Sequence, residues 1–311
     1  MPLNYRKEGD EKEEKKKGMK KSAEDIEGYT LQKPQYTFEN IVLTEKQSYD
    51  IKVAIGYEEY KDLLMNRWGM KKLYPEKRGL FINLYGEPGT GKTMTAHAIA
   101  AQLDKKVVLV NYAEIESKYV GETSKNLVKI FTFAVEKDAV LIFDEADALL
   151  SKRVTNMTNS TDVSVNQTKS VLLNLLNDYQ GIVIFTTNFI SNYDAAFMRR
   201  IPFQIKFDFP DEKQRKSLWE YYLSSDMPYE CDIGSLCRNY SGISGSDISN
   251  CVLMSALDAA MDQKNIVTEN YFKENLEKIL KAKRENRTGE YRIVSQREVT
   301  EDYAMKQIGG K

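Results

Sequence analysis

The sequence contains one histidine and three cysteines among its 311 residues. A single histidine excludes metal sites that need two of them, including the zinc site of an H-E-x-x-H metalloprotease. The cysteines, Cys231, Cys237 and Cys251, form no C-x-x-C pair, and their odd number argues against a disulfide framework. This use of cysteine favours a reducing compartment.

Charge of one sign and long apolar runs are also missing. The 45 basic and 46 acidic residues leave a net charge of −1. Such a balance offers little attraction to phosphates, so we do not expect nucleic acid as a partner. No apolar run reaches the roughly 20 residues that a membrane-spanning helix needs, and residues 1–8 lack the apolar core of a secretory signal. We therefore expect a cytoplasmic protein without a membrane partner.

A glycine-rich segment at residues 86–93 matches the phosphate-binding pattern G-x-x-x-x-G-K-[ST]. An apolar, strand-like run precedes it and a helical run follows it, and this context disfavours a chance glycine turn. The glycines let successive N–H groups face phosphate oxygens beside a positive helix N-terminus. We expect Lys92 to reach the β- and γ-phosphates and the Thr93 hydroxyl to bind Mg²⁺. The other expected nucleotide contacts in this segment are Gly86, Glu87, Pro88, Gly89, Thr90, Gly91 and Met94.

A pair of acids follows a second apolar run. Residues 139–143 read as a strand that is buried on both faces of a parallel sheet, and the run ends in Asp144-Glu145. Such a strand delivers its last residues to the edge where ligands bind. We expect Asp144 to support Mg²⁺ and Glu145 to orient and deprotonate the attacking water. The simpler alternative, that both acids only cap the next helix, is disfavoured by the phosphate loop upstream.

The pattern along the chain predicts two domains between two extensions. We expect residues 1–35 to be a charged, disordered tail, in which the lysines at 15–17 either contact an acidic partner or, more simply, keep the chain soluble. Residues 36–209 alternate strands and helices, which predicts a three-layer α/β domain with a parallel sheet. Residues 210–287 read as a small all-helical domain, and residues 288–311 as an extension with a short strand at 291–294.

Individual elements follow from the same pattern. The expected strands are residues 80–85, 107–111, 140–143, 182–186 and 203–207. The expected helices are residues 94–103, 124–137, 167–179, 212–223, 233–239, 246–264 and 269–281. Residues 155–166 are polar without helical periodicity, so we expect a mobile loop there.

The phosphate loop, the strand ending in Asp144-Glu145 and the helical segment together resemble the AAA+ ATPases over roughly residues 36–280. The resemblance implies a P-loop NTPase domain followed by a helical lid. It also implies hydrolysis of ATP with Mg²⁺ in a ring of identical subunits, a hexamer in this family. The resemblance also implies that Asn188, at the end of the strand that follows Asp144-Glu145, helps to place the attacking water.

Further residues carry the resemblance. Arg199 and Arg200 look like the arginine-finger segment, which acts on the neighbouring subunit's ATP, and the adjacent pair is similar to the pattern in spastin and katanin. Whether one or both act between subunits, or pair within their own subunit, stays open. Gly245 and Ser246 lie in a turn similar to GxSGxDI, which implies contacts with adenine and ribose. Ile41 is the expected contact from the segment where the family has Asp-Ile-Gly-Gly, although those glycines are absent here.

Tyr119-Val120-Gly121 resembles the aromatic–apolar–glycine step that lines the pore in the protein-remodelling branch of the family. Tyr119 offers a flat amphipathic surface and Val120 an apolar contact for a protein substrate. Read alone, the three residues are a strand end and a turn. The resemblance therefore implies a ring that unfolds or disassembles a protein. The alternatives are an ATP-controlled assembly switch without threading, and microtubule severing.

Overall fold

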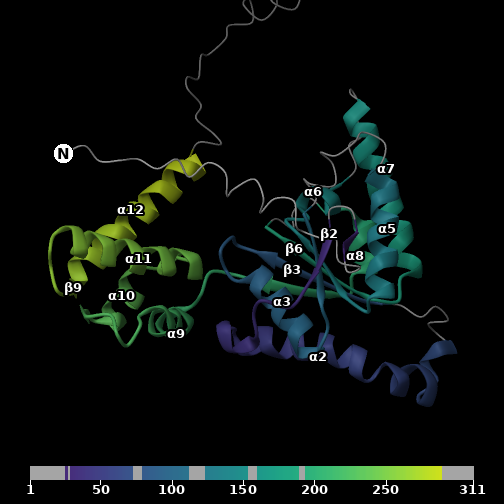
Figure 1. Ribbon diagram of the computed structural model, residues 1–311, viewed down its shortest axis with the longest axis horizontal. Coiled ribbons are helices and arrows are strands. Elements are labelled where there is room, and N and C mark those ends of the chain that lie inside the picture. Colours follow the sequence, from purple (N-terminus) through teal and green to yellow (C-terminus); the bar gives the residue numbers. More distant parts are fainter. Residues whose placement is uncertain are drawn as a thin grey trace, which may run out of the picture. The chain divides into compact units, whose positions relative to one another are not determined.

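The computed structural model describes residues 25–26, 29–72, 79–111, 123–152, 160–188 and 193–288. The chain divides into two compact units, residues 1–210 and 211–311 (Figure 1). The pore segment with Tyr119 and Val120 and the expected strand at 291–294 lie outside the described residues. Among the helices that are described, none combines the length and the apolar character that crossing a membrane requires.

A mostly parallel sheet forms the centre of the first unit. The strand order in the described residues is β1-β2-β4-β5-β6-β3-β7. The five parallel strands are β3 (Leu80–Gly86), β4 (Val107–Asn111), β5 (Val140–Asp144), β6 (Ile182–Thr187) and β7 (Phe203–Phe207). All five were expected at these positions, to within one residue. The sheet confirms the parallel α/β fold that the sequence predicts.

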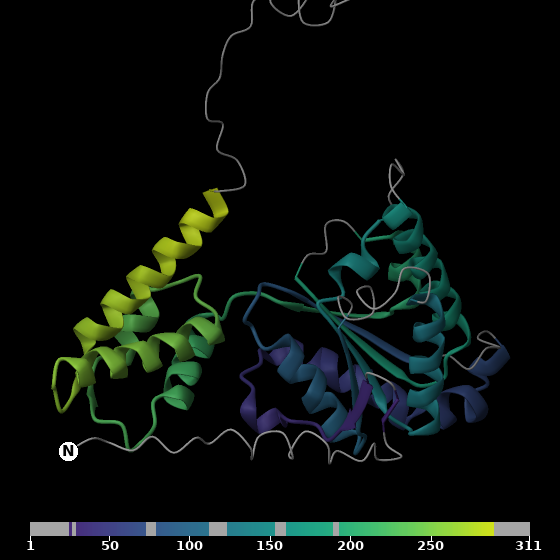
Figure 2. The same ribbon diagram turned by 45° about the horizontal axis from the view of Figure 1, so that its top comes forward.

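Helices cover both faces of this sheet (Figure 2). Strand side chains alternate between the faces, so Phe143 and Phe185 join one core cluster while Ile142 and Ile184 join the other. The first cluster lies under α5 (Thr123–Glu136), α6 (Asp147–Leu150), α7 (Ser160–Asp178) and α8 (Ala195–Arg200). The second lies against α2 (Glu45–Glu59) and α3 (Lys92–Gln102). The short helical turns are η1 (Phe38–Asn40), η2 (Leu63–Arg67) and η3 (Met70–Lys72).

Order begins earlier than the charged-tail prediction allowed. Strand β2 (Tyr29–Gln32) pairs with β4, and β1 (Asp25–Ile26) pairs with β2, both antiparallel. Tyr29 and Leu31 are 7% and 9% exposed and belong to a core cluster. These two residues alternate with the polar Thr30 and Gln32, as in a strand with one buried face. The prediction that residues up to 35 lie outside the fold was therefore wrong.

The predicted loop at residues 155–166 was also wrong in part, because α7 already begins at Ser160. The later turns of this helix bury Leu172, Leu173 and Leu176 in the core. Extending an existing helix costs little once it is nucleated. The buried later turns of α7 therefore stabilise the helix enough for the polar residues from Ser160 onward to be helical as well.

The second unit is a helical domain. Its helices are α9 (Glu212–Tyr222), α10 (Ile233–Asn239), α11 (Gly245–Met261) and α12 (Glu269–Thr288). Trp219 and Phe272 meet edge to face in its core, with ring centroids 5.6 Å apart. A parallel pair of two-residue strands, β8 (Tyr229–Glu230) and β9 (Val267–Thr268), departs from the all-helical prediction.

Candidate active site

The phosphate loop adopts a backbone that favours glycine. Gly86, Gly89 and Gly91 have φ angles of 132°, 71° and 92°. At Gly86 a Cβ atom would also lie only 2.1 Å from the carbonyl oxygen of Phe207 in the neighbouring strand. The loop therefore turns where other residues would be strained or would clash. Ile41 lies beside it, because a Cβ atom on Gly91 would be 4.0 Å from the Ile41 Cγ2 atom.

Lys92 begins α3 and is folded over the loop. Its Nζ atom donates hydrogen bonds to the carbonyl oxygens of Gly86 and Glu87, at 2.9 and 2.7 Å. Burial lowers the pKa of Lys92, while the nearby carboxylates of Asp147, Asp144 and Glu87 act in the opposite direction. The Lys92 ammonium group thus lies at the N-terminus of α3, where the free N–H groups and the helix dipole also favour binding of an anion.

The hydroxyl of Thr93 and the carboxylate of Asp144 form the second part of the site. Thr93 Oγ1 donates to Asp144 Oδ1 at 2.8 Å, and the Thr186 hydroxyl donates to the same oxygen. These contacts join α3, β5 and β6 at the carboxyl ends of the parallel strands. A hydroxyl and a carboxylate are hard oxygen ligands, and Mg²⁺ is usually held by one or two carboxylates together with substrate phosphates. The residues present therefore fit Mg²⁺ bound to a nucleotide.

Glu145 follows Asp144 in a left-handed backbone conformation, with φ of 52°. This conformation is uncommon for residues other than glycine and is concentrated at functional sites. The turn is held by hydrogen bonds from the N–H groups of Glu145 and Ala146 to Thr186 Oγ1 and the Thr186 carbonyl, at 3.2 and 2.9 Å. The Glu145 side chain is exposed and has no hydrogen-bond or ion-pair partner within the described parts of the chain. It is thus presented at the strand ends beside Asp144.

Asn188 directly follows β6. Its backbone N–H donates to both carboxylate oxygens of Asp147, at 3.0 and 3.2 Å. Asp147 is the first residue of α6 and holds Asn188 at the same sheet edge as Asp144 and Glu145. Asp147 was not expected in the site, although it comes only two residues after Glu145.

A series of hydrogen-bonded polar side chains connects β6, β3 and β7 across the sheet. Asn83 in β3 donates to Gln204 Oε1 at 2.8 Å and accepts from Thr187 Oγ1 at 3.3 Å, and the Tyr193 hydroxyl donates to Thr187. Gln204 in turn donates to the carbonyl oxygen of Ile201 at 2.8 Å. Tyr193 precedes α8 and Ile201 follows it, so this series ties both ends of α8 to the phosphate-loop strand. Asn83 is fully buried, and its signal in the sequence is a polar residue inside an apolar strand.

We expect Asn83→Leu to lower the free energy of unfolding by about 1–3 kcal/mol, because Thr187 and Gln204 would lose their buried partner. Urea unfolding measures this change. In a Thr187→Val background the same substitution should cost less, since one of the two partners is then already absent. An unchanged urea midpoint for Asn83→Leu would show that this series of hydrogen bonds does not stabilise the sheet.

The arginine pair lies toward the amino ends of the parallel strands, whereas the phosphate loop follows the carboxyl end of β3. Phe203 pairs with Ile82 and Phe207 with Gly86 in parallel register. These two levels are about 13 Å apart along the strands, and Arg200 comes three residues before Phe203. The arginines therefore do not share an edge with their own subunit's phosphate loop.

The two arginines differ in their surroundings. Arg200 Nε donates to Asn177 Oδ1 at 2.7 Å and Nη1 to the carbonyl oxygen of Ala196 at 3.0 Å. Arg199 is exposed and has no such partner in the ranges that the structure covers. Asn177, near the end of α7, was missed by sequence analysis because it is 23 residues away along the chain. The structure thus holds Arg200 in place and leaves Arg199 to solvent.

Gly245 and Ser246 begin α11 in the second unit. Ser244 caps this helix, accepting from the backbone N–H of Asp247 at 3.3 Å, and the backbone N–H of Ser244 donates to the Asp247 carboxylate at 2.6 Å. The two residues therefore lie at the N-terminus of a helix. Their contact with a nucleotide stays a prediction.

Comparison with known proteins identifies the family. Residues 82–210 match the "ATPase family associated with various cellular activities (AAA)". The chain is 32% identical over 267 residues to cell division protein C of Sulfolobus acidocaldarius, across 78% of this chain and 70% of that protein. The chain belongs to the AAA family of ATPases. The AAA resemblance is thereby confirmed, and so is the prediction of an ATP-hydrolysing enzyme that uses ATP and Mg²⁺.

Other relatives are similar to this AAA ATPase over comparable lengths. The 26S proteasome regulatory subunit 8 homolog of Schizosaccharomyces pombe is 31% identical, across 79% of this chain and 62% of the relative. The proteasome-activating nucleotidase of Methanothermobacter thermautotrophicus is 30% identical, across 82% of this chain and 62% of the relative. The chain thus spans less than two thirds of these two relatives. The spastin- and katanin-like reading of the arginine pair stays a prediction.

Proposed function

We propose that this AAA ATPase hydrolyses ATP at sites shared between neighbouring subunits of a ring and uses the energy to remodel a protein substrate. The observation that supports the proposal is the distance between the phosphate loop and the arginine pair within one subunit. The phosphate loop and Glu145 lie at one edge of the sheet, and Arg199 lies toward the other. An arginine in this position serves the ATP of an adjacent subunit, not its own.

Each residue at the phosphate-loop edge has a proposed role in this reaction. Water would attack the γ-phosphate of bound ATP, and the Mg²⁺ ion would neutralise part of the phosphate charge. Lys92 turns from the loop carbonyls to the phosphate oxygens, and Thr93 with Asp144 holds the metal ion. Glu145 takes the proton of the attacking water, which Asn188 orients.

The arginines complete the proposed site from the neighbour. Arg199 neutralises charge on the transferred phosphoryl group, and its planar guanidinium suits the phosphate oxygens. Arg200, tied to Asn177 and Ala196, holds the end of α8 in place. Gly245, Ser246 and Ile41 are proposed to contact adenine and ribose.

The proposed assembly is a homohexamer in the cytoplasm that acts on a protein. Two of the relatives bear names that connect them with the proteasome, and a third is named for cell division. These names support work on protein substrates but identify none for this chain. Tyr119 and Val120 are proposed to grip the substrate in the pore. Microtubule severing is a narrower alternative that only the arginine pair suggests, and an ATP-controlled switch is the alternative without threading.

We expect Tyr119→Ala to keep basal ATP hydrolysis and to lose its stimulation by a permanently unfolded test protein, because the aromatic contact with the substrate is gone. Steady-state hydrolysis with and without that protein measures both quantities, and Tyr119→Phe is the matched control that keeps the ring. Stimulation that survives in Tyr119→Ala would overturn the pore assignment. A wild-type enzyme that the unfolded protein neither binds nor stimulates would favour the switch.

A further inference from the structure

Lys169, in α7, is a buried lysine that no step of the proposed reaction uses. The residue is 1% exposed. Its Nζ atom donates hydrogen bonds to the carbonyl oxygen of Ser151 at 2.8 Å, to Ser151 Oγ at 2.9 Å and to the carbonyl oxygen of Lys152 at 3.1 Å. These three acceptors match the three N–H donors of an ammonium group. The position of the Lys169 ammonium group is therefore fixed.

A fully buried lysine is unusual in a folded protein. Lysine is almost never fully buried unless its charge is paired, because an ammonium group that is taken out of water loses its hydration. Hydrogen bonds from a charged donor are about twice as strong as those between neutral groups. The contacts of Lys169 therefore hold Ser151 and Lys152 firmly in place.

The end of α6 is joined to the segment that leads into α8. Ser151 directly follows α6 and forms an antiparallel bridge with Tyr193. The N–H group of Asp194 donates to the carbonyl oxygen of Leu150 at 2.9 Å. Asp194 is also the N-cap of α8, because its carboxylate accepts from a backbone N–H group in the first turn of that helix at 2.9 Å. Lys169 therefore fastens the end of α6 and, through it, the beginning of α8.

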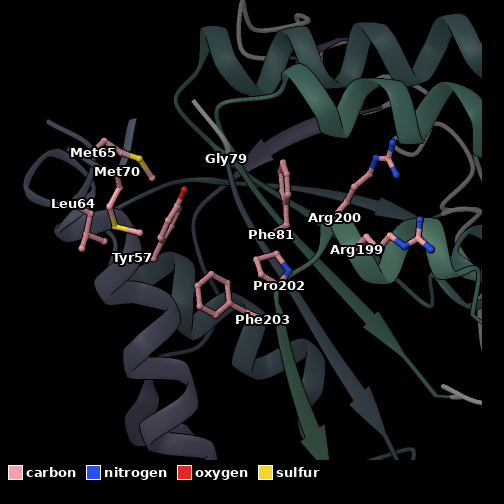
Figure 3. Close-up of a pocket in the computed structure, with 10 residues that line it drawn as sticks. All are labelled: Tyr57, Leu64, Met65, Met70, Gly79, Phe81, Arg199, Arg200, Pro202 and Phe203. Carbon is pink, nitrogen blue, oxygen red and sulfur yellow. The ribbon is translucent and has the colours of Figure 1, made fainter. Parts of the chain in front are cut away.

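Each of these two helices carries a group with a proposed part in hydrolysis. Helix α6 begins at Asp147, whose carboxylate oxygens accept from the N–H group of Asn188 at 3.0 and 3.2 Å. Helix α8 ends at the arginine pair, and Figure 3 shows Arg199 and Arg200 extending from it, away from Pro202. Under the proposed function, Asn188 serves the ATP of its own subunit and Arg199 the ATP of the next.

We propose that Lys169 is a positioning residue for ATP hydrolysis, which holds Asn188 and Arg199 in one fixed relation within a subunit. The proposal rests on the shared-site function above and adds the group that connects one ATP site of the ring with the next. The two helices on either side of the connection have only 4 and 6 residues. A shift at Ser151 is therefore passed on to both groups.

Lys169→Met tests this role, because methionine is a long unbranched side chain without the ammonium group. We expect kcat to fall by about tenfold to 10²-fold, since misplacing a catalytic group by about 1 Å costs up to about 10²-fold in rate. The KM for ATP should stay at the wild-type value, because the phosphate loop is untouched. Steady-state hydrolysis is measured at a protein concentration where the mass of the ring is established, together with binding of a fluorescent ATP analogue.

Ile130→Ala in α5 is the matched control for a loss of stability alone. Ile130 is 1% exposed, belongs to the core cluster that α7 covers and makes none of the hydrogen bonds described above. Its truncation leaves a cavity, so the melting temperature should fall while kcat stays at the wild-type value. If the melting curve shows that Lys169→Met is unfolded, Lys169→Gln takes its place, because its amide keeps two neutral donors.

Mixed rings separate the two paths from Lys169. When Lys92→Ala and Arg199→Ala subunits assemble together, an active site takes its phosphate loop from an Arg199→Ala subunit and its arginine from a Lys92→Ala subunit. Lys169→Met added to the Arg199→Ala subunit tests the path to Asn188. Added to the Lys92→Ala subunit, it tests the path to Arg199. We expect hydrolysis by the mixture to fall in both cases.

A folded Lys169→Met that binds ATP and keeps the wild-type kcat would overturn the proposal, as would a loss of kcat that Ile130→Ala shares. A loss in only one of the two mixed rings would overturn the connection between neighbouring sites. Arg199→Ala alone is measured in parallel. Wild-type activity in that variant would contradict the shared-site function itself, and the path from Lys169 to Arg199 with it.

Discussion

Glu145→Gln is expected to lower the rate of ATP hydrolysis by about 10²–10⁴-fold, the usual contribution of a positioned general base. The amide keeps the size of the side chain but cannot take the proton of the attacking water. The phosphate loop, Lys92 and the Thr93–Asp144 pair are unchanged, so ATP should still bind. Steady-state turnover and binding of a fluorescent ATP analogue measure the two effects separately.

Glu136→Gln at the exposed end of α5 is the matched control for this substitution. It makes the same chemical change outside the site and should leave both turnover and binding as in the wild type. Normal turnover in Glu145→Gln would remove Glu145 from the role of the base. Loss of ATP binding would instead assign it to the nucleotide pocket.

Arg199→Ala is expected to lower kcat by about 10³-fold or more, the contribution that an arginine supplied by a neighbouring protein makes in related phosphoryl transfers. Arg199 is the exposed member of the pair, whereas Arg200 is already bonded to Asn177 and Ala196. The rate should be measured at a protein concentration where the mass of the ring is established, because a lost ring would also abolish activity.

Arg200→Ala separates the two arginines. Since Arg200 holds the end of α8, its loss should reduce stability and displace Arg199, and the matched Asn177→Ala should give a similar, smaller loss. An active Arg199→Ala together with an inactive Arg200→Ala would reverse the assignment. Similar 10³-fold losses for both arginines, with Asn177→Ala unaffected, would show that both reach the phosphate.

The parts of the fold that sequence predicts well are those with local causes. Four mostly apolar runs read directly as strands buried on both faces of a parallel sheet, and the alternating run at residues 203–207 reads as a half-buried strand. The phosphate loop and the Asp144-Glu145 pair are contiguous motifs next to such runs. Their conformation depends on neighbours in the sequence, so their residues could be named in advance.

The elements that escaped prediction depend on distant partners. Strand β2 is short and follows a charged segment, and only its pairing with β4 shows its place in the sheet. The first turns of α7 are polar and follow from the packing of its later turns. No local pattern predicts that Asn83 meets Thr187 across 104 residues, or that Asn177 meets Arg200. Such contacts follow from the topology of the fold, which brings segments that are distant in the sequence close together in space.

The most direct test of the shared site is to mix two inactive variants. Lys92→Ala removes the phosphate-loop half of the site, and Arg199→Ala removes the arginine half. In a ring of both, an Arg199→Ala subunit keeps its ATP site and can lie beside a Lys92→Ala subunit that keeps its arginine. Equal amounts, randomly assembled, pair about one quarter of the sites correctly.

Hydrolysis is therefore measured for each variant alone and for their co-assembled mixtures, with wild type plus Lys92→Ala to confirm subunit exchange. Shared sites predict that the mixture hydrolyses ATP well above the sum of its two components, with a maximum at intermediate proportions. A mixture that exchanges subunits but stays at that sum in every proportion would contradict a site built from two subunits.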